Sequence, residues 1–329
     1  MYIESVLHLQ GQKCDQWQTL LHREGLTVET IPEETVLVWE EDKLIATGSR
    51  DGNVLKYLAV DSAYRGQDLT ATVLTNLRQN AFRAGFDQLF LYTKPENEWM
   101  FTSLFFHSVA KTKNVLLMES KPSGIQSFLS SLPEKKAEGK IGSLVMNCNP
   151  FTKGHLYLAE IAAKTCDWVY VFVLSEDKSE FSANDRLEMV KLGTAHIPNL
   201  TVLPTGPYLI SAATFPTYFI KDRNNAENVQ CLLDIAVFCD HFVPKYHITH
   251  RFVGTEPNCL VTDAYNRALA KNLPSRGICL EQIPRLEIGG QPVSASTVRA
   301  LLKQGHLAQA KAFLPETTWN YLQTNGLCK

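Results

Sequence analysis

The stretch Ile141-Gly-Ser-Leu-Val-Met-Asn-Cys-Asn-Pro-Phe-Thr-Lys-Gly-His155 decides the fold of this chain. Its apolar first half, which ends at Met146, predicts a buried strand. The polar run 147–150 predicts a turn, and a helix follows whose inner face carries Leu156, Leu158, Ile161 and Ala162. A strand, a tight turn and a helix N-terminus favour phosphate binding, because the first N–H groups of a helix lack intrahelical acceptors and lie at its positive end.

Three residues of this turn carry the chemistry that we expect. Thr152 offers a hydroxyl, Gly154 lets a ligand approach the backbone, and the imidazole of His155 can stabilise charge on a phosphoryl oxygen. The ordinary alternative is a helix-capping threonine followed by a surface histidine. The motif T-x-G-H therefore needs a second signature before it indicates a function.

Composition bounds the class of protein. The chain has 329 residues, which favours two domains, and a net charge of −2, which predicts no strong attraction to nucleic acid or to an anionic membrane. The N-terminus is too polar for a signal peptide, and no apolar run approaches the roughly 18 residues of a membrane span. Eight scattered cysteines without a Cys-x-x-Cys pair indicate reduced thiols. We therefore expect a soluble, cytoplasmic protein.

Residues 1–120 read as a first, α+β domain. Strands are predicted at 36–39, 43–48, 54–60, 88–92 and 114–118, the first two as a hairpin, and helices at 69–84 and 98–108. This order resembles the GNAT acetyltransferase fold. The loop that binds the coenzyme A pyrophosphate in that family corresponds here to Arg65-Gly-Gln-Asp-Leu-Thr70, with Asp68 where a glycine is expected. A carboxylate there repels a pyrophosphate, so we expect a structural role or the docking of a partner rather than acetyl transfer.

Residues 121–140 are rich in Pro, Gly, Ser and charge and predict a linker with a short helix. The second domain, 141–329, alternates strands with helices. Strands are predicted at 167–174, 200–203, 249–254 and 277–283, and helices at 182–192 and 226–242. Such alternation predicts an α/β fold, a Rossmann-like, doubly wound parallel sheet. Ligands of these sheets bind beyond the carboxyl ends of the strands, where Asn147–His155 is expected to lie.

A second signature stands far downstream, at Val293-Ser-Ala-Ser-Thr-Val-Arg299. Ser294, Ser296 and Thr297 can bind phosphates at the start of a helix, and Arg299 lies one turn further along. Together the two signatures resemble those of the nucleotidyltransferase superfamily. The pair predicts attack on the α-phosphorus of ATP, with Mg²⁺ on the triphosphate and catalysis by positioning and charge stabilisation.

The combination of both domains resembles the citrate (pro-3S)-lyase ligase family. Similar stretches include 51–57, 146–155, 181–186, 206–211 and 251–257. The resemblance implies an AMP-forming acid–thiol ligase that uses ATP and acetate to acetylate citrate lyase through acetyl-adenylate. The implied acceptor is the thiol of the phosphoribosyl-dephospho-CoA arm on the acyl-carrier subunit, and we expect the first domain to dock this arm or its subunit. The implied ATP-binding residues are Asn147, Asn149, Pro150, Phe151, Thr152, Gly154, His155, Glu256, Ser294, Ser296, Thr297 and Arg299, of which Thr152, His155 and Arg299 are the candidate catalytic residues.

Several alternatives stay open. The same signatures serve adenylyltransferases that make dephospho-CoA or NAD, a nucleotide-binding module without turnover needs only part of the set, and an acetyl-CoA-dependent acetyltransferase would use the first domain. Arg186 is predicted to bind acetate or a phosphate, or to form a surface ion pair with Asp185 or Glu188. Cys148 is expected to pack under the turn. The cysteines and histidines between 231 and 250 fit no standard zinc spacing, so no metal ligand is predicted.

Overall fold

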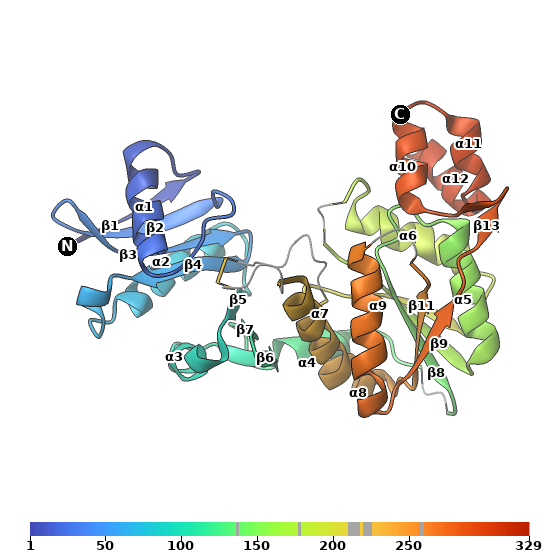
Figure 1. Ribbon diagram of the computed structural model, residues 1–329, viewed down its shortest axis with the longest axis horizontal. Coiled ribbons are helices and arrows are strands. Elements are labelled where there is room, and N and C mark those ends of the chain that lie inside the picture. The colour runs from blue at the N-terminus through green and yellow to red at the C-terminus, as the bar shows by residue number, and fades with distance from the viewer. Residues whose placement is uncertain (136–137, 177–178, 210–217, 220–225, 257–259, 329) are drawn as a thin grey trace. The chain divides into compact units, whose positions relative to one another are not determined.

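The computed structural model describes residues 1–329 except 136–137, 177–178, 210–217, 220–225, 257–259 and 329 (Figure 1). Contacts between Cα atoms divide the chain into two compact units. Unit 1 contains Met1–Gly124 and Phe215–Leu233, and unit 2 contains Ile125–Thr214 and Asp234–Lys329. The sequence assigned 215–233 to the second domain, whereas this stretch groups with unit 1.

Unit 1 is built on a mixed sheet with the strand order β1-β2-β3-β4-β5-β7-β6. Only β4 and β5 run parallel within it, and the other neighbouring pairs are antiparallel. Its strands are β1 (Tyr2–Leu7), β2 (Glu34–Glu40), β3 (Lys43–Asp51), β4 (Val54–Val60), β5 (Phe90–Thr93), β6 (His107–Lys111) and β7 (Leu116–Glu119). Its helices are α1 (Gly11–Arg23), α2 (Leu69–Arg83) and α3 (Glu98–Ser103). Val73 and Leu77 of α2 pack on the sheet within its core.

The helix predicted over 98–108 was too long. The α-helix α3 ends at Ser103, and Phe105 adopts the left-handed conformation with φ 61°. The chain then continues as β6, which pairs with β7. The run of aromatic residues misled the prediction, because Phe101 and Phe106 are both buried but Phe101 lies on α3 and Phe106 in the turn before β6.

Unit 2 is built on a parallel sheet with the order β10-β9-β8-β11-β12. Its strands are β8 (Ile141–Met146), β9 (Trp168–Val173), β10 (Leu200–Pro204), β11 (His250–Gly254) and β12 (Cys279–Ile283), with a small ribbon of β13 (Glu287–Ile288) and β14 (Gln291–Pro292). Helices α5 and α9 lie on opposite faces of this sheet (Figure 1). The predicted fold class is therefore confirmed: an α+β unit precedes a doubly wound parallel α/β unit.

The remaining helices follow in chain order. They are α4 (Gly124–Ser131), α5 (Lys153–Thr165), α6 (Ala183–Thr194), α7 (Ala226–Val237), α8 (Val243–Tyr246), α9 (Leu260–Asn272), α10 (Ala295–Lys303), α11 (Leu307–Ala312) and α12 (Glu316–Thr324), with a π-helical segment, Phe238–Phe242, between α7 and α8. In α6, Ser182 is the N-cap, as predicted, and accepts a hydrogen bond from the N–H of Asp185.

The topology of unit 2 fixes where a ligand can bind. From β8 the chain proceeds to β9 and β10 on one side, and β11 and β12 then fill the other side. The direction of winding thus reverses between β8 and β11. At such a switch point the loops beyond the strand ends diverge and leave a crevice.

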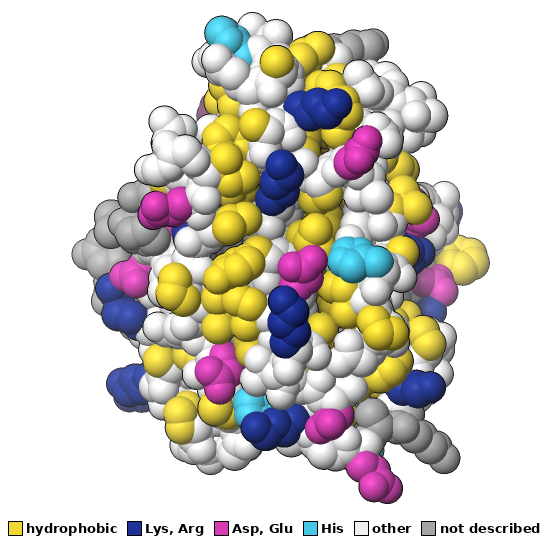
Figure 2. All heavy atoms as spheres, turned by 90° about the vertical axis from the view of Figure 1, so that its right-hand side faces the viewer, with side chains coloured by type: hydrophobic (Ala, Val, Ile, Leu, Met, Phe, Trp, Pro, Cys, Tyr) yellow, Lys and Arg dark blue, Asp and Glu magenta, His cyan; other side chains and the backbone are white. Residues whose placement is uncertain are grey.

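The surface of this protein mixes charge with apolar side chains. On the face seen in Figure 2, the described Lys and Arg residues are interspersed with Asp and Glu, so that face carries no broad field of one sign. Among the described helices, none is long and apolar enough to cross a membrane.

Candidate active site

A cleft of about 700 Å³ opens at the carboxyl ends of β8, β11 and β12. It therefore occupies the switch point of the sheet. The following predicted site residues line it: Asn147, Thr152, Gly154, His155, Glu256, Ser294, Ser296, Thr297 and Arg299. Tertiary structure thus brings together two signatures that lie more than a hundred residues apart in the sequence.

The N-terminus of α5 forms one wall of this cleft, and a capping box fixes it. The hydroxyl of Thr152 accepts a hydrogen bond from the N–H of His155 at 3.4 Å, and Nδ1 of His155 accepts one from the N–H of Thr152 at 3.0 Å. An Nδ1 that accepts from a backbone amide carries no proton, so the neutral ring holds its proton on Nε2. The Nε2–H group is therefore the hydrogen-bond donor that the ring can offer to a ligand.

Thr152 can both cap the helix and bind a ligand in this geometry. Its side chain caps α5, which is the ordinary role of a threonine at this position. The hydroxyl also lies 3.0 Å from Nδ1 of His155, which already accepts from the backbone, so the hydroxyl hydrogen can go either to Nδ1 or to a ligand. Gly154 contributes in a different way: Lys153 N–H is bound to Phe313 O, whereas no acceptor is found for Gly154 N–H in the described part of the chain. This amide is the backbone donor left for an anion at the start of α5.

The electrostatics of the cleft keep His155 neutral. Desolvation by burial, and then the positive charge of Arg285, lower the pKa of His155 to about 4. The ring also stacks on Phe151, with centroids 5.9 Å apart and planes 14° from parallel. We expected this imidazole to hydrogen-bond to a phosphate and to neutralise its charge. In the free protein the ring is neutral, so the hydrogen bond is the part of this role that it can perform.

The second signature lines the same cleft beside the start of α5, because a Cβ added at Gly154 would come within 3.4 Å of Val293. Ser294 is the N-cap residue of α10, Ser296 and Thr297 follow in its first turn, and the hydroxyls of Ser294 and Ser296 lie 2.6 Å apart. Arg299 donates from Nη1 to the carbonyl oxygen of Asn149, at 2.5 Å. Since Asn149 lies in the first turn and Arg299 in the second signature, this bond joins the two motifs directly. Within the described residues no carboxylate lies within 4 Å of Arg299.

Arg285 lines the cleft as well, and the sequence reasoning missed it. Its Nη2 pairs with the buried carboxylate of Glu256, and its Nε donates to the carbonyl of Thr255 at 3.0 Å. Glu256 is thus held by a cation of the protein itself. A signal was present, because Arg285 follows the strand predicted at 277–283 by two residues, at the edge where ligands of such sheets bind.

Arg251 is the second cation of the cleft that was missed. It lies on β11, is 2% exposed, and stacks on Phe238 at 4.6 Å from the ring centroid. Its Nε and Nη1 find no hydrogen-bond acceptor in the described part of the chain. Burial lowers the pKa of its guanidinium, and nearby Tyr265, Asp234 and Cys239 oppose that effect. Nothing in its position along a buried strand distinguished it in the sequence.

Three predicted ATP-binding residues do not line the cleft. Asn149 is buried, and its side-chain oxygen accepts from the N–H of Phe181 at 3.1 Å. Pro150, which follows a cis peptide bond, and the fully buried Phe151 lie beneath the turn. Their burial places these three side chains inside the turn, and their predicted contact with ATP stays a prediction.

Arg186 occupies a place that neither prediction anticipated. It is fully buried and does not line the cleft. Its guanidinium donates to the carbonyls of Phe181, Leu174 and Glu176, and to both oxygens of Asn147. The expected surface ion pair is wrong, because Asp185 bonds to Ser182 and Tyr321 instead, and Glu188 to Lys191. With its donors engaged by these carbonyls, Arg186 holds the loops behind the turn.

The cysteine predictions hold where the structure tests them. Cys148 is 1% exposed, and burial raises the pKa of its thiol far above neutrality, so it packs under the turn as expected.

Unit 1 has a cavity of its own, of about 620 Å³. The predicted loop lines it through Arg65, Gly66, Asp68, Leu69 and Thr70, and Trp99, which is 76% exposed, borders it as well. Asp68 adopts the left-handed conformation with φ 55° at the start of α2.

A parallel sheet with two helix N-termini, an imidazole and a guanidinium lining one cleft at its switch point is typical of nucleotide-binding α/β enzymes. A family model described as the citrate lyase ligase C-terminal domain matches residues 141–322. The citrate (pro-3S)-lyase ligase of Escherichia coli (strain K12) is 38% identical over 321 residues, which is 95% of this chain and 91% of that protein. The ligase of that name from Klebsiella pneumoniae is 37% identical, covering 92% of this chain and 90% of its own.

The corresponding ligase of Haemophilus influenzae is 37% identical over 325 residues, 96% of each chain. This chain therefore belongs to the citrate (pro-3S)-lyase ligase family, and it is an enzyme. The likeness extends over both units. Family membership thus favours the ligase over the adenylyltransferase that the two signatures alone had left open.

Proposed function

We propose that this enzyme activates acetate with ATP and transfers the acetyl group to the prosthetic-group thiol of citrate lyase. An acetate oxygen attacks the α-phosphorus of ATP, and pyrophosphate leaves with the electrons of the broken P–O bond. The carrier thiolate then attacks the carbonyl carbon of the resulting acetyl-adenylate, and AMP leaves. The observation that carries the proposal is the hydrogen bond from Arg299 to Asn149 O, which unites the two signatures in one cleft.

In the first step the protein positions and stabilises charge. The Nε2–H of His155 and the hydroxyl of Thr152 donate to the α-phosphoryl oxygens, which gain negative charge as acetate attacks. The amide of Gly154 faces the same anion. The hydroxyls of Ser294, Ser296 and Thr297 bind the β- and γ-phosphates, and Arg299 holds the leaving pyrophosphate.

Mg²⁺ supplies charge neutralisation on the triphosphate in this proposal. The donor set of the cleft limits how the protein contributes. Glu256 is the one carboxylate among the described lining residues, and it is engaged by Arg285. We therefore propose that phosphate oxygens and water hold the metal ion, not a protein carboxylate.

Acetate needs a cation that the phosphates do not use, and we propose Arg251 in place of Arg186. Arg251 lines the cleft, and its Nε and Nη1 have no acceptor among the residues that the structure describes. Replacing it with methionine is expected to raise the KM for acetate at least about tenfold and to leave the KM for ATP unchanged, because a charged hydrogen bond contributes about 1.5–3 kcal/mol. An equal rise in both constants would assign Arg251 to the fold.

The test of the reaction itself is ATP–pyrophosphate exchange by the full chain with Mg²⁺ and either acetate or 4′-phosphopantetheine. We expect exchange that depends on acetate and is lost in Arg299→Met. The matched control is Arg276→Met, whose guanidinium pairs with Asp240 away from the cleft residues. Exchange with phosphopantetheine alone would refute the ligase proposal and establish the adenylyltransferase. If neither supports exchange, the assay is repeated with deacetylated citrate lyase, and failure there as well refutes the proposal.

We also propose that the cavity of unit 1 receives the acyl-carrier subunit through its phosphoribosyl-dephospho-CoA arm. The size of the cavity and the exposed Trp99 that borders it support this role. Trp99→Ala is expected to raise the KM for citrate lyase without changing acetate-dependent exchange. Phe82→Ala is the control, since Phe82 is 74% exposed but does not line the cavity. Equal effects of the two variants would contradict the assignment.

We propose that the reaction takes place in the cytoplasm, where ATP and reduced thiols are available.

A further inference from the structure

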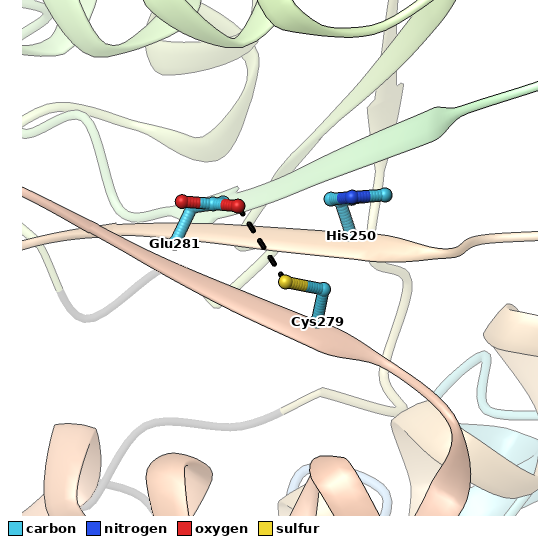
Figure 3. Close-up of side chains that lie close together, drawn as sticks. All are labelled: His250, Cys279 and Glu281. Carbon is cyan, nitrogen blue, oxygen red and sulfur yellow. Dashed lines mark hydrogen bonds between the residues drawn. The ribbon is translucent and has the colours of Figure 1, made fainter.

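Three side chains that the proposed reaction does not use meet on the face of the sheet of unit 2. They are His250, the first residue of β11, and Cys279 and Glu281, the first and third residues of β12. One ligand atom of each lies within 4.8 Å of the others, and this is the one such cluster among the residues that the structure describes. Figure 3 shows the three side chains projecting from neighbouring strands toward one another.

The register of the sheet creates this cluster. His250 and Cys279 are direct partners in the parallel pairing of β11 with β12. Side chains two apart on a strand point to the same face, so Glu281 joins Cys279 on the side where His250 lies. The strands hold the three groups together without help from a loop. A sheet is a more rigid support for ligands than a loop is.

From these residues we infer a binding site for one borderline-soft divalent cation, of which Zn²⁺ is the biological example. Thiolate, imidazole and carboxylate are all zinc ligands, and a thiolate disfavours Mg²⁺ and Ca²⁺. Three protein ligands leave one position of a tetrahedron for water. The site begins at the amino ends of β11 and β12, whereas the cleft lies at their carboxyl ends, so it is separate from the proposed ATP site.

The hydrogen bonds around His250 support a ligand role for its Nε2. Nδ1 lies 2.8 Å from the hydroxyl oxygen of Thr249. That hydroxyl accepts from the N–H of Ile141 at 3.0 Å and has a second acceptor, the carbonyl of Ile141 at 3.2 Å. The hydroxyl hydrogen can therefore go to Ile141, while Nδ1–H donates to Thr249. Such an outer partner fixes the tautomer that a metal-binding histidine needs.

Charge also favours a cation here. The thiol of Cys279 lies 3.5 Å from Oε1 of Glu281, so two groups that can both become anionic face each other. Cys166, at the end of α5, is a further neighbour, because its thiol approaches Gly142, the register partner of His250. A thiolate and a carboxylate together balance the two charges of the metal ion.

A metal ion at this site would cross-link β11 to β12. Beyond their carboxyl ends the two strands lead to Glu256 and Arg285, the ion pair in the cleft. A metal ion at the other end would hold the same two strands in register. We therefore expect binding to raise the melting temperature of the full chain.

The test uses metal-free full chain, titrated with Co²⁺ as a spectroscopic probe and then with Zn²⁺ in competition, without ATP. We expect one equivalent of Co²⁺ to give a thiolate-to-metal charge-transfer band, and Zn²⁺ to displace it. Cys279→Ser is expected to lose this band and at least about 100-fold of the affinity, and His250→Gln to weaken it. Cys14→Ser, which changes a free thiol of unit 1, is the matched control and should bind as the natural chain does.

Other results have definite meanings. A band that persists in Cys279→Ser, or no band at all, overturns the inference. Should Cys279→Ser fail to fold, Glu281→Gln, which keeps shape and thiol, must weaken Zn²⁺ binding and abolish the Zn²⁺-dependent rise in melting temperature. If Glu281→Gln binds and melts as the natural chain does, the inference is wrong. None of these metal-binding and melting measurements depends on whether the enzyme acetylates citrate lyase.

Discussion

Replacing His155 with asparagine separates the two functions of this residue. The side-chain oxygen of asparagine can take the position of Nδ1 and accept from the N–H of Thr152, so the capping box is kept. The Nε2–H donor that faces the cleft is lost. At a pKa of about 4, only about one ring in a thousand is protonated at pH 7, so the lost group is a neutral donor to an anion.

The magnitude follows from that geometry. A hydrogen bond from a neutral donor to a charged acceptor contributes about 1.5–3 kcal/mol, which corresponds to a loss of about 10- to 150-fold in kcat. We expect acetate-dependent ATP–pyrophosphate exchange to fall by this factor in His155→Asn, while the unfolding free energy changes by less than about 0.5 kcal/mol. His155→Gln, whose amide reaches the position of Nε2, should lose less exchange and more stability than His155→Asn.

The pH dependence supplies the refuting result. The γ-phosphate of ATP titrates in the same range, so the informative quantity is the ratio of kcat/KM between the natural enzyme and His155→Asn. A neutral donor predicts a ratio that is flat from pH 6 to pH 8. A ratio that falls as the pH rises through about 6.5 would show that a protonated imidazole acts, and the account of the capping box would be wrong.

Three further predictions concern stability. Gly193→Ala should lower the free energy of urea unfolding by about 1–3 kcal/mol, because its new Cβ would come within 2.4 Å of the buried ring of Phe151. The control is Gly254→Ala, whose Cβ would meet no described atom within 4 Å and should change stability by less than about 0.5 kcal/mol. Equal effects of the two variants would refute this packing argument. Arg186→Met should cost at least about 3 kcal/mol, since it leaves several buried carbonyls without donors, and a smaller loss would show that water replaces them. Folding lowers the pKa of His155 to about 4, so the folded state favours the neutral ring and the unfolded state binds the proton more tightly. The free energy of unfolding should therefore be highest above about pH 6.5 and fall by up to about 3 kcal/mol as the pH drops toward 4. His155→Asn should lack this loss, and identical pH profiles of the two proteins would contradict the prediction.

Much of the architecture could be predicted from local pattern. The strand–turn–helix around Thr152 carries its own signals, an apolar run, a polar turn and an amphipathic helix, and all three elements appear where expected. The prediction of Ser182 as the N-cap of a helix also rested on local sequence, and the structure confirms it. The helix predicted over 98–108 failed because periodicity cannot distinguish one buried helix from a short helix followed by a strand.

Side-chain partners were beyond such reasoning. Arg186 looks like a surface cation beside two acidic residues, yet the fold buries it among the carbonyls of segments that are distant in sequence. Arg285 gained its place in the cleft only because β12 pairs with β11. Asn149, Pro150 and Phe151 belong to the signature but are buried, since the side chain of Asn149 accepts from the N–H of Phe181 and the ring of Phe151 packs on Gly193.

The sequence by itself determined most of the strands and helices, the two signatures and the family. Each of these rests on residues that are close along the chain, where hydrophobic period, capping and turn chemistry act. Only the tertiary structure decided that Arg299 bonds to the first turn, that the imidazole of His155 is neutral, and that His250, Cys279 and Glu281 share one face. The reason is physical: strand pairing and burial set these distances and pKa values, and both depend on contacts between residues that are far apart in the chain.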